Sequence, residues 1–286
     1  MTLRAPANGI EIAYETFGSP EARPLLLITG LGCQMIQWDD RFCELLADRG
    51  YHAVRFDNRD SGESTHLAEA GTPALDGSGE VPYLLDDMAD DAAGLLDALG
   101  WDTAHVVGLS MGGMIAQSLA IRHPHRMRSL TSIMSTPSPQ AALLTDPDVL
   151  MPAFTPDRES AIRRALDNCA VVGSPGYPFD REWNAEIAGL GYDRSYDPAG
   201  TARQVAAIMA SGDRAPRLKE LAIPALVLHG EDDPLVPLPA GIATADAIPG
   251  ARLITFPGMG HDLPAELWPS FVDAIDELTT FADSGR

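Results

Sequence analysis

The sequence predicts an α/β fold in which a mostly parallel central sheet carries helices on both faces. Short apolar runs alternate along the chain with longer amphipathic segments, and this alternation is typical of strand–helix–strand units. The chain has 286 residues, of which 45% are hydrophobic, so it can bury a sizeable core. This length corresponds to one large domain or two small ones.

The predicted strands are short apolar runs with little alternation between polar and apolar positions. The first run, Leu25-Leu26-Leu27-Ile28-Thr29, lies between Pro24 and Gly30 and is typical of a strand buried on both faces. Similar runs occupy residues 53–56, 104–109, 130–134, 225–228 and 252–256. Their lack of alternation favours the interior of a parallel sheet.

Apolar residues recur at helical spacing between these runs. In the segment 84–99 they occur at i, i+3, i+4 and i+7, aspartates occupy the opposite face, and Gly100 follows as a candidate C-cap. Phe42, Leu45 and Leu46 indicate a shorter helix that stops near Gly50. Such connections place helices on the faces of a parallel sheet.

One region interrupts the alternation of strands and helices. Residues 136–215 contain no buried-strand run, but they contain helix-like segments such as 158–172 and several Pro and Gly residues. A linker is an alternative only for the Pro- and Ser-rich stretch 137–147. We therefore expect a core domain made of residues 1–135 and 216–286, with residues 136–215 forming an inserted helical cap.

The charge balance excludes several classes of function. The chain has 20 Lys and Arg against 41 Asp and Glu, a net charge of −21, which disfavours binding to nucleic acid or to an anionic membrane surface. No apolar run approaches the length of a membrane span, and the N-terminal residues lack the apolar core of a secretory signal. The three cysteines suggest no disulfide framework. We expect a cytoplasmic protein, and a homodimer stays open.

The segment Gly108-Leu109-Ser110-Met111-Gly112 fits the Gly-x-Ser-x-Gly motif of a nucleophilic serine. A sharp turn from strand to helix lifts the serine hydroxyl clear of the sheet, and side chains at the two glycines would clash with that turn. The motif lies between an apolar run and a helical pattern, as it requires. The alternative is a tight glycine turn with an incidental serine.

A serine hydroxyl needs a base and a group that orients the base. His261 lies in a Gly-rich loop after the last strand run, and Glu231, Asp232 and Asp233 follow the run at 225–228. Loops beyond the carboxyl ends of parallel strands form the sites of such sheets. The order serine, acid, histidine also matches one class of catalytic triad.

Nearly the whole chain resembles the α/β-hydrolase fold family, with the cap region the least typical part, and three segments are similar to the aclacinomycin methylesterase type within it. These segments are Arg55-Phe56-Asp57-Asn58-Arg59-Asp60-Ser61-Gly62-Glu63-Ser64, residues 104–112 and residues 257–264. The resemblance implies hydrolysis of a methyl ester on a polyketide-derived substrate. It also implies that the cap is inserted between the sixth and seventh core strands.

The resemblance assigns roles to individual residues. Ser110 is implied as nucleophile and His261 as general base; the family acid lies three residues after the glycine at 230, which selects Asp233. Some relatives place the acid after the sixth strand, but Ser135-Thr136-Pro137 offers no carboxylate there.

The resemblance also implies an oxyanion hole. Its donors are the backbone amides of Leu31 and Met111, although Thr29 stands where many relatives have histidine. A simple tight turn is the alternative for residues 30–33. We expect Asp57 and Arg59 to brace the loop after the strand at 53–56.

The pocket beside these loops is expected to be apolar. The candidates for substrate contact are Met35, Trp38 and Met114, with Leu31, Ile36, Met111 and Trp183 also near the mouth. Such a lining suits a small-molecule hydrophobic ester or lactone. Cys33 could also reach the pocket. No metal or organic cofactor is expected.

We therefore predict a carboxylic ester hydrolase that forms an acyl-enzyme on Ser110. A lactonase with the same residues is the nearest alternative. A perhydrolase and a non-catalytic protein that binds a small molecule are further alternatives, because both can retain the serine, histidine and aspartate.

Overall fold

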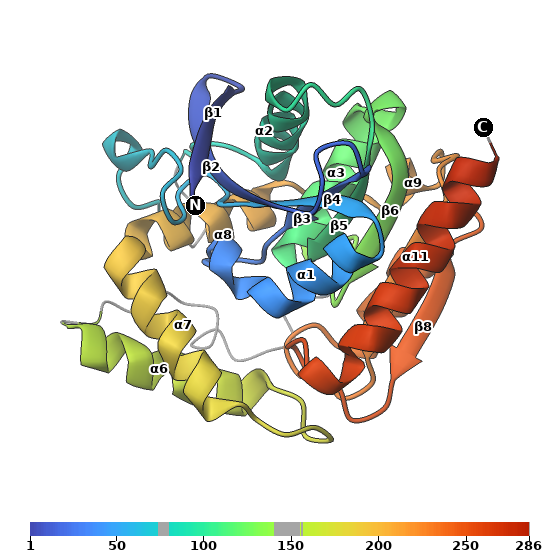
Figure 1. The fold of residues 1–286 in the computed structure, drawn as a ribbon. Helices are drawn as coiled ribbons and strands as arrows, with labels where there is room; N and C mark the ends of the chain where they lie inside the picture. The colour runs from blue at the N-terminus through green and yellow to red at the C-terminus, as the bar shows by residue number, and fades with distance from the viewer. Residues whose placement is uncertain (74–79, 140–154, 156, 286) are drawn as a thin grey trace.

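The computed structural model describes residues 1–73, 80–139, 155 and 157–285, which form a central sheet with helices on both faces (Figure 1). Its strands are β1 (Leu3–Ala7), β2 (Ile10–Phe17), β3 (Arg23–Ile28), β4 (Tyr51–Phe56), β5 (Ala104–Leu109), β6 (Met127–Ile133), β7 (Ala225–Gly230) and β8 (Arg252–Phe256). The strand order is β1-β2-β4-β3-β5-β6-β7-β8. β2 pairs antiparallel with β1 and β4, and the remaining pairs are parallel. The mostly parallel sheet and all six predicted strands are confirmed.

The first two strands were not expected from the apolar runs. They form a hairpin whose turn is Asn8-Gly9, with φ angles of 47° and 79°. Positive φ at both central turn residues matches the twist of the flanking strands. The Asn-Gly pair is the sequence signal that marks this hairpin.

Helices cover both faces of the sheet. Successive residues of β3 point to opposite faces, and each face packs against a different set of helices. Leu25 and Leu27 pack against α1 (Asp40–Asp48) and α11 (Trp268–Ser284). Leu26 and Ile28 pack in the cluster that contains α2 (Leu85–Ala98) and α3 (Met111–Arg122). The same side includes residues of α9 (Ala215–Leu218) and α10 (Leu238–Ala247). The helices predicted near 42–50 and at 84–99 are confirmed as α1 and α2.

The chain between β6 and β7 contains α6 (Arg158–Val172), α7 (Arg181–Arg194) and α8 (Pro198–Ala210). The helix expected at 158–172 is confirmed. α6 and α7 pack against each other and lie outside the two helical layers of the sheet (Figure 1). Short 3-10 turns occur at Met35–Gln37, Ala68–Ala70, Pro124–Arg126 and Ala265–Leu267. Most of the stretch considered as a linker, residues 140–147, lies outside the described residues.

None of the helices in the described ranges combines the length and the apolar run that a bilayer crossing requires.

Candidate active site

Four loops at the carboxyl edge of the parallel strands carry the residues that the sequence singled out. Leu31 follows β3, Ser110 follows β5, Asp233 follows β7 and His261 follows β8. Parallel strands end at the same edge of a sheet. These four residues therefore lie close together there, although they are far apart in the sequence.

Ser110 sits on a strained turn between β5 and α3. Its φ and ψ angles are 55° and −118°, a combination that non-glycine residues rarely adopt. A Cβ atom at Gly108 would lie 2.2 Å from the Gly112 oxygen, and one at Gly112 would lie 2.1 Å from the Ile28 oxygen. Both glycines are therefore needed for the chain to pass, as the Gly-x-Ser-x-Gly spacing predicts.

Ser110, His261 and Asp233 form a hydrogen-bonded chain. Ser110 Oγ lies 2.9 Å from His261 Nε2, and His261 Nδ1 lies 2.7 Å from Asp233 Oδ2. The other carboxylate oxygen, Oδ1, accepts the backbone N–H groups of Leu235 and Val236 at 2.9 and 2.8 Å. The carboxylate is fixed on both sides and can hold the imidazole with Nε2 directed at the serine.

The neighbouring acids are engaged elsewhere. Asp232 Oδ2 accepts the Gly258 N–H at 2.8 Å, and Glu231 Oε1 accepts the Thr255 hydroxyl at 2.7 Å. Neither makes a hydrogen bond to His261 among the described contacts, whereas Asp233 does.

The histidine loop is attached to the end of α6. The His261 N–H donates to the Val172 oxygen at 2.7 Å, and the Gly260 N–H donates to Ser174 Oγ at 2.9 Å. Ser174 in turn donates its hydroxyl proton to Asp262. Burial raises the pKa of Asp262 above its usual range, and the Ser174 hydrogen bonds oppose that rise.

The two expected oxyanion donors lie beside Ser110. A Cβ atom at Gly30 would lie 3.3 Å from Ser110 Cβ, so the loop that carries Leu31 passes next to the serine. Met111 is the first residue of α3, where backbone N–H groups have no partner within the helix. In the described ranges, neither the Leu31 nor the Met111 N–H donates a hydrogen bond.

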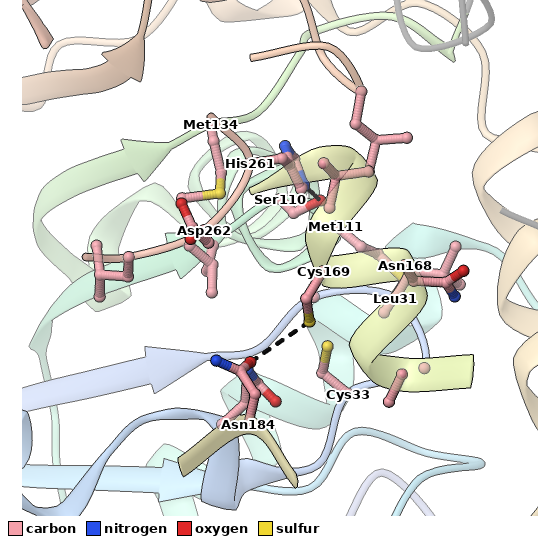
Figure 2. Close-up of a pocket in the computed structure, with 18 of the residues that line it drawn as sticks. Leu31, Cys33, Ser110, Met111, Met134, Asn168, Cys169, Asn184, His261 and Asp262 are labelled. Carbon is pink, nitrogen blue, oxygen red and sulfur yellow. Dashed lines mark hydrogen bonds between the residues drawn. The ribbon is translucent and has the colours of Figure 1, made fainter. Parts of the chain in front are cut away.

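Ser110 and His261 line a cavity of about 810 Å³ (Figure 2). Of the three side chains expected to contact substrate, Met114 lines the cavity, but Met35 and Trp38 do not. Both are buried in the protein interior, and Trp38 stacks on Phe42 with ring centroids 5.6 Å apart. This corrects the expectation for these two residues, because their apolar side chains pack in the core.

The opposite wall of the cavity comes from α6 and α7. Asn168 and Cys169 of α6, and Trp183 and Asn184 of α7, line it, and Figure 2 shows Cys169 across from Cys33. The polar members have no sequence motif that marked them in advance. Burial raises the pKa values of Cys33 and Cys169 to about 11, so both thiols are protonated near neutral pH and are weak nucleophiles.

Asp57 and Arg59 brace the loops, as expected. Asp57 accepts the Met35 N–H at 2.7 Å and the Glu63 N–H at 2.9 Å. The Arg59 guanidinium makes two hydrogen bonds of 2.6 Å to Asp91.

One group of side chains in the described ranges has the residue types of a metal site. Asp60, His66 and Asp197 have ligand atoms within 4.8 Å of one another. However, Arg203 Nη2 lies 2.8 Å from Asp60 and 3.1 Å from Asp197, and His66 pairs with Asp197 at 2.7 Å. The guanidinium already supplies positive charge to these carboxylates.

The fold and this site define a hydrolase of the α/β class. The model of the alpha/beta hydrolase fold family matches residues 23–266, and the chain belongs to that family. It is similar to the rhodomycin D methylesterase DauP of Streptomyces sp. (strain C5), with 31% identity over 91% of this chain and 92% of that protein. The resemblance to the methylesterase type is thereby confirmed.

Two other similarities concern different activities. The chain is 27% identical to the bifunctional esterase/perhydrolase DCH of Acinetobacter calcoaceticus over 90% of this chain and 91% of that protein. The crystal structure of the enol-lactonase from Burkholderia xenovorans LB400 superposes with a TM-score of 0.73 and 25% identity, covering 97% of this chain and 100% of that one.

Proposed function

We propose that this protein hydrolyses a carboxylic ester through an acyl-enzyme on Ser110. The observation that carries the proposal is the hydrogen-bonded chain from Ser110 through His261 to Asp233, of which Ser110 and His261 line a large cavity. The strained backbone at Ser110 supports a nucleophilic role, because this turn presents the hydroxyl above the sheet edge.

The mechanism assigns each group a step. His261 Nε2 removes the Ser110 proton as Oγ attacks the ester carbonyl carbon, while Asp233 stabilises the imidazolium. The backbone amides of Leu31 and Met111 stabilise the tetrahedral oxyanion. His261 then donates the proton to the departing alcohol, and later removes a proton from the water that hydrolyses the acyl-enzyme.

The proposed substrate is a hydrophobic ester with a large acyl part, such as a polyketide-derived methyl ester. A cavity of about 810 Å³ lies in the upper part of the range typical of small-molecule sites. Similarity to a rhodomycin D methylesterase supports a methyl ester as the reacting group. We further propose that residues 136–215 act as a cap, because α6 and α7 supply one wall of the cavity.

Lactone hydrolysis is the second candidate, supported by similarity to the enol-lactonase. A lactone uses the same attack by Ser110, but its alcohol stays attached to the acyl group. Transfer of the acyl group to peroxide, as the name of the Acinetobacter relative suggests, would also start from the acyl-enzyme. The cytoplasmic location and the homodimer remain predictions.

The first experiment measures p-nitrophenyl ester hydrolysis by the wild type and by Ser110→Ala. A fluorophosphonate probe followed by mass spectrometry identifies the labelled residue. We expect burst release of p-nitrophenol in the wild type and a label on Ser110. Ser118→Ala is the matched control, because this buried hydroxyl lies on α3 and has no hydrogen-bond partner among the residues that the structure describes.

The outcomes separate the candidates. No turnover with any acyl length, together with an unlabelled Ser110, would contradict the proposal and favour a protein that binds a small molecule without reaction. If the ester reacts, a methyl ester and a lactone of matched carbon number are compared by product analysis. A higher kcat/KM for ring opening would replace the ester with a lactone as the substrate class.

A further inference from the structure

Gln204 connects α8 to two loops at the edge of the sheet. Its side chain is fully buried. Its Oε1 accepts the Gly32 N–H at 2.8 Å, and its Nε2 donates to the Arg59 oxygen at 2.8 Å. One amide therefore ties the loop after β3, which carries Leu31, to the loop after β4.

The hydrogen bonds around Leu31 fix both of its peptide units. The Gly30 oxygen, which shares a planar peptide unit with the Leu31 N–H, accepts the Cys33 N–H at 3.3 Å. That contact is at the long end of hydrogen-bond distances and is weak by itself. The next peptide unit ends in the Gly32 N–H, which Gln204 holds at 2.8 Å. The shorter contact is therefore the main restraint on the orientation of the Leu31 peptide.

The surroundings of Gly32 show that α8 packs tightly against the loop after β3. Gly32 has a φ of +64°, and a Cβ atom added to it would lie 3.0 Å from Thr201 Cγ2, also on α8. Arg59, whose backbone oxygen holds the other end of Gln204, is itself locked by two hydrogen bonds of 2.6 Å to Asp91. The Gln204 amide thus fixes the loop after β3, which carries Leu31, relative to the loop after β4, which Arg59 and Asp91 hold in place.

We propose that Gln204 is a positioning residue that aims the Leu31 N–H at the oxyanion. The proposal rests on the proposed ester hydrolysis and adds a residue that no motif marks. Gln204 is not among the described residues that line the cavity with Ser110. It acts by holding the Gly32 peptide, so its loss should impair binding of the tetrahedral state more than binding of the ground-state ester.

The test compares Gln204→Met with the wild type, using p-nitrophenyl hexanoate as substrate and 1,1,1-trifluorooctan-2-one as inhibitor. Ser110 Oγ adds to the ketone carbon, its proton passes to His261, and the carbonyl oxygen becomes an oxyanion in the same position as in the reaction. Removal of one oxyanion donor lowers kcat by about 10²–10³-fold. A donor that is present but poorly oriented should lower kcat less than a missing donor does, by about 10–100-fold.

We therefore expect Gln204→Met to lower kcat by about 10–100-fold and to change KM by less than about threefold. Binding of the ketone inhibitor should weaken by the same factor as kcat. Gln204→Glu retains an acceptor for the Gly32 N–H but loses the donor to the Arg59 oxygen. The decrease in kcat should therefore be smaller in this variant. This second variant also gives a result if Gln204→Met does not fold. Unfolding midpoints are measured for each variant.

Ser211→Ala is the matched control for loosening of α8. Ser211 directly follows α8; its hydroxyl accepts the Leu85 N–H at 2.9 Å and donates to the Ala207 oxygen of α8 at 2.6 Å. The change therefore removes the link between the end of α8 and α2 without touching the Gly32 loop. A kcat for Gln204→Met within twofold of the wild type, or an equal loss in Ser211→Ala, would overturn the inference. Absence of ester hydrolysis and of Ser110 labelling in the wild type would instead overturn the proposed function.

Discussion

The loops of the core and the helices between β6 and β7 contribute to the site in different ways. Ser110, Asp233 and His261 lie on core loops, where glycines allow close backbone approach and the spacing is visible in the sequence. The helices contribute single polar side chains, such as Gln204, which holds the loop after β3 that lies beside Ser110. Motifs therefore reveal the reacting groups, whereas the groups that support them are visible only in the structure.

The two supported loops also differ in how they are held. The histidine loop is attached to α6 itself by the backbone hydrogen bond from His261 to Val172, which most substitutions in the helix would leave intact; the side-chain contact of this loop comes from Ser174, which lies after α6. In the loop after β3, the Gly32 N–H next to Leu31 is held by the side chain of Gln204, which a single substitution removes, while Asp57 holds the Met35 N–H further along the loop. Mutations in the helices should therefore affect the oxyanion side more easily than the histidine side.

The largest expected effect tests the core. Asp233→Asn keeps the shape of the side chain but removes the charge that orients His261, and in serine hydrolases this change lowers kcat by about 10⁴-fold. We expect a loss of that order in p-nitrophenyl ester hydrolysis. Asp232→Asn is the control. Among the described contacts the Asp232 side chain accepts only the Gly258 N–H, so this substitution should change kcat by less than about tenfold. Equal losses in both variants would place the acid elsewhere.

The second prediction tests how strongly α8 is attached to the core. Arg203 makes two hydrogen bonds of 2.8 Å to Asp60, and both side chains are almost fully buried. Arg203→Met leaves a buried carboxylate without its cation, so we expect a loss of about 3–5 kcal/mol in the free energy of unfolding. Urea denaturation measures it. Adding Asp60→Asn should restore part of the loss; no recovery would show that the Arg203 packing, and not the charge pair, matters.

The same contrast explains what the sequence could predict. Buried strands such as Leu25–Thr29 and the turn at Ser110 are dictated by local patterns, and the structure contains both. The hairpin of β1 and β2 was missed because its exposure does not alternate strictly, although Asn8-Gly9 marks its turn.

The substrate contacts were predicted less well. An apolar residue near a motif, such as Met35 or Trp38, can face either the core or the cavity. The contacts of Gln204 depend on how α8 packs across 172 residues of sequence separation from Gly32, which no local pattern encodes.

A third prediction concerns pH and involves the core without the helices between β6 and β7. His105, on the same strand as the turn to Ser110, is buried, and this burial lowers its pKa to about 4 despite the opposing charge of Asp283. An exposed histidine titrates near pH 6.5, so between these values the unfolded chain binds a proton that the folded chain does not. The free energy of unfolding should fall by about 1–3 kcal/mol as the pH drops from about 6.5 to 4.

Urea denaturation across this pH range checks the prediction. His105→Gln should remove the His105 part of the pH dependence, whereas His229 and His52, whose pKa values burial also lowers, keep theirs. Comparison of the two proteins at pH 7.5 corrects for the lost packing. If the free energy of unfolding depended on pH equally in both proteins, the acid sensitivity would come from other groups. If α8 detached first on acidification, activity would be lost before the core unfolds, and the independence of the two regions would have to be revised.

The smallest expected effect tests the cavity wall. Trp183 of α7 lines the cavity and lies on no catalytic loop, so Trp183→Ala should weaken binding of large aromatic esters without altering the chemistry. We expect KM for a naphthyl ester to rise about 5–10-fold, as the loss of part of an aromatic contact predicts, while kcat and the kinetics of a p-nitrophenyl acetate control stay within twofold. Trp101→Ala removes a tryptophan that packs on His52 away from the cavity, and it should leave both substrates unaffected. A fall in kcat for both esters would instead mean that α7 also positions the reacting groups, and the division between reacting core and supporting helices would then fail at this helix.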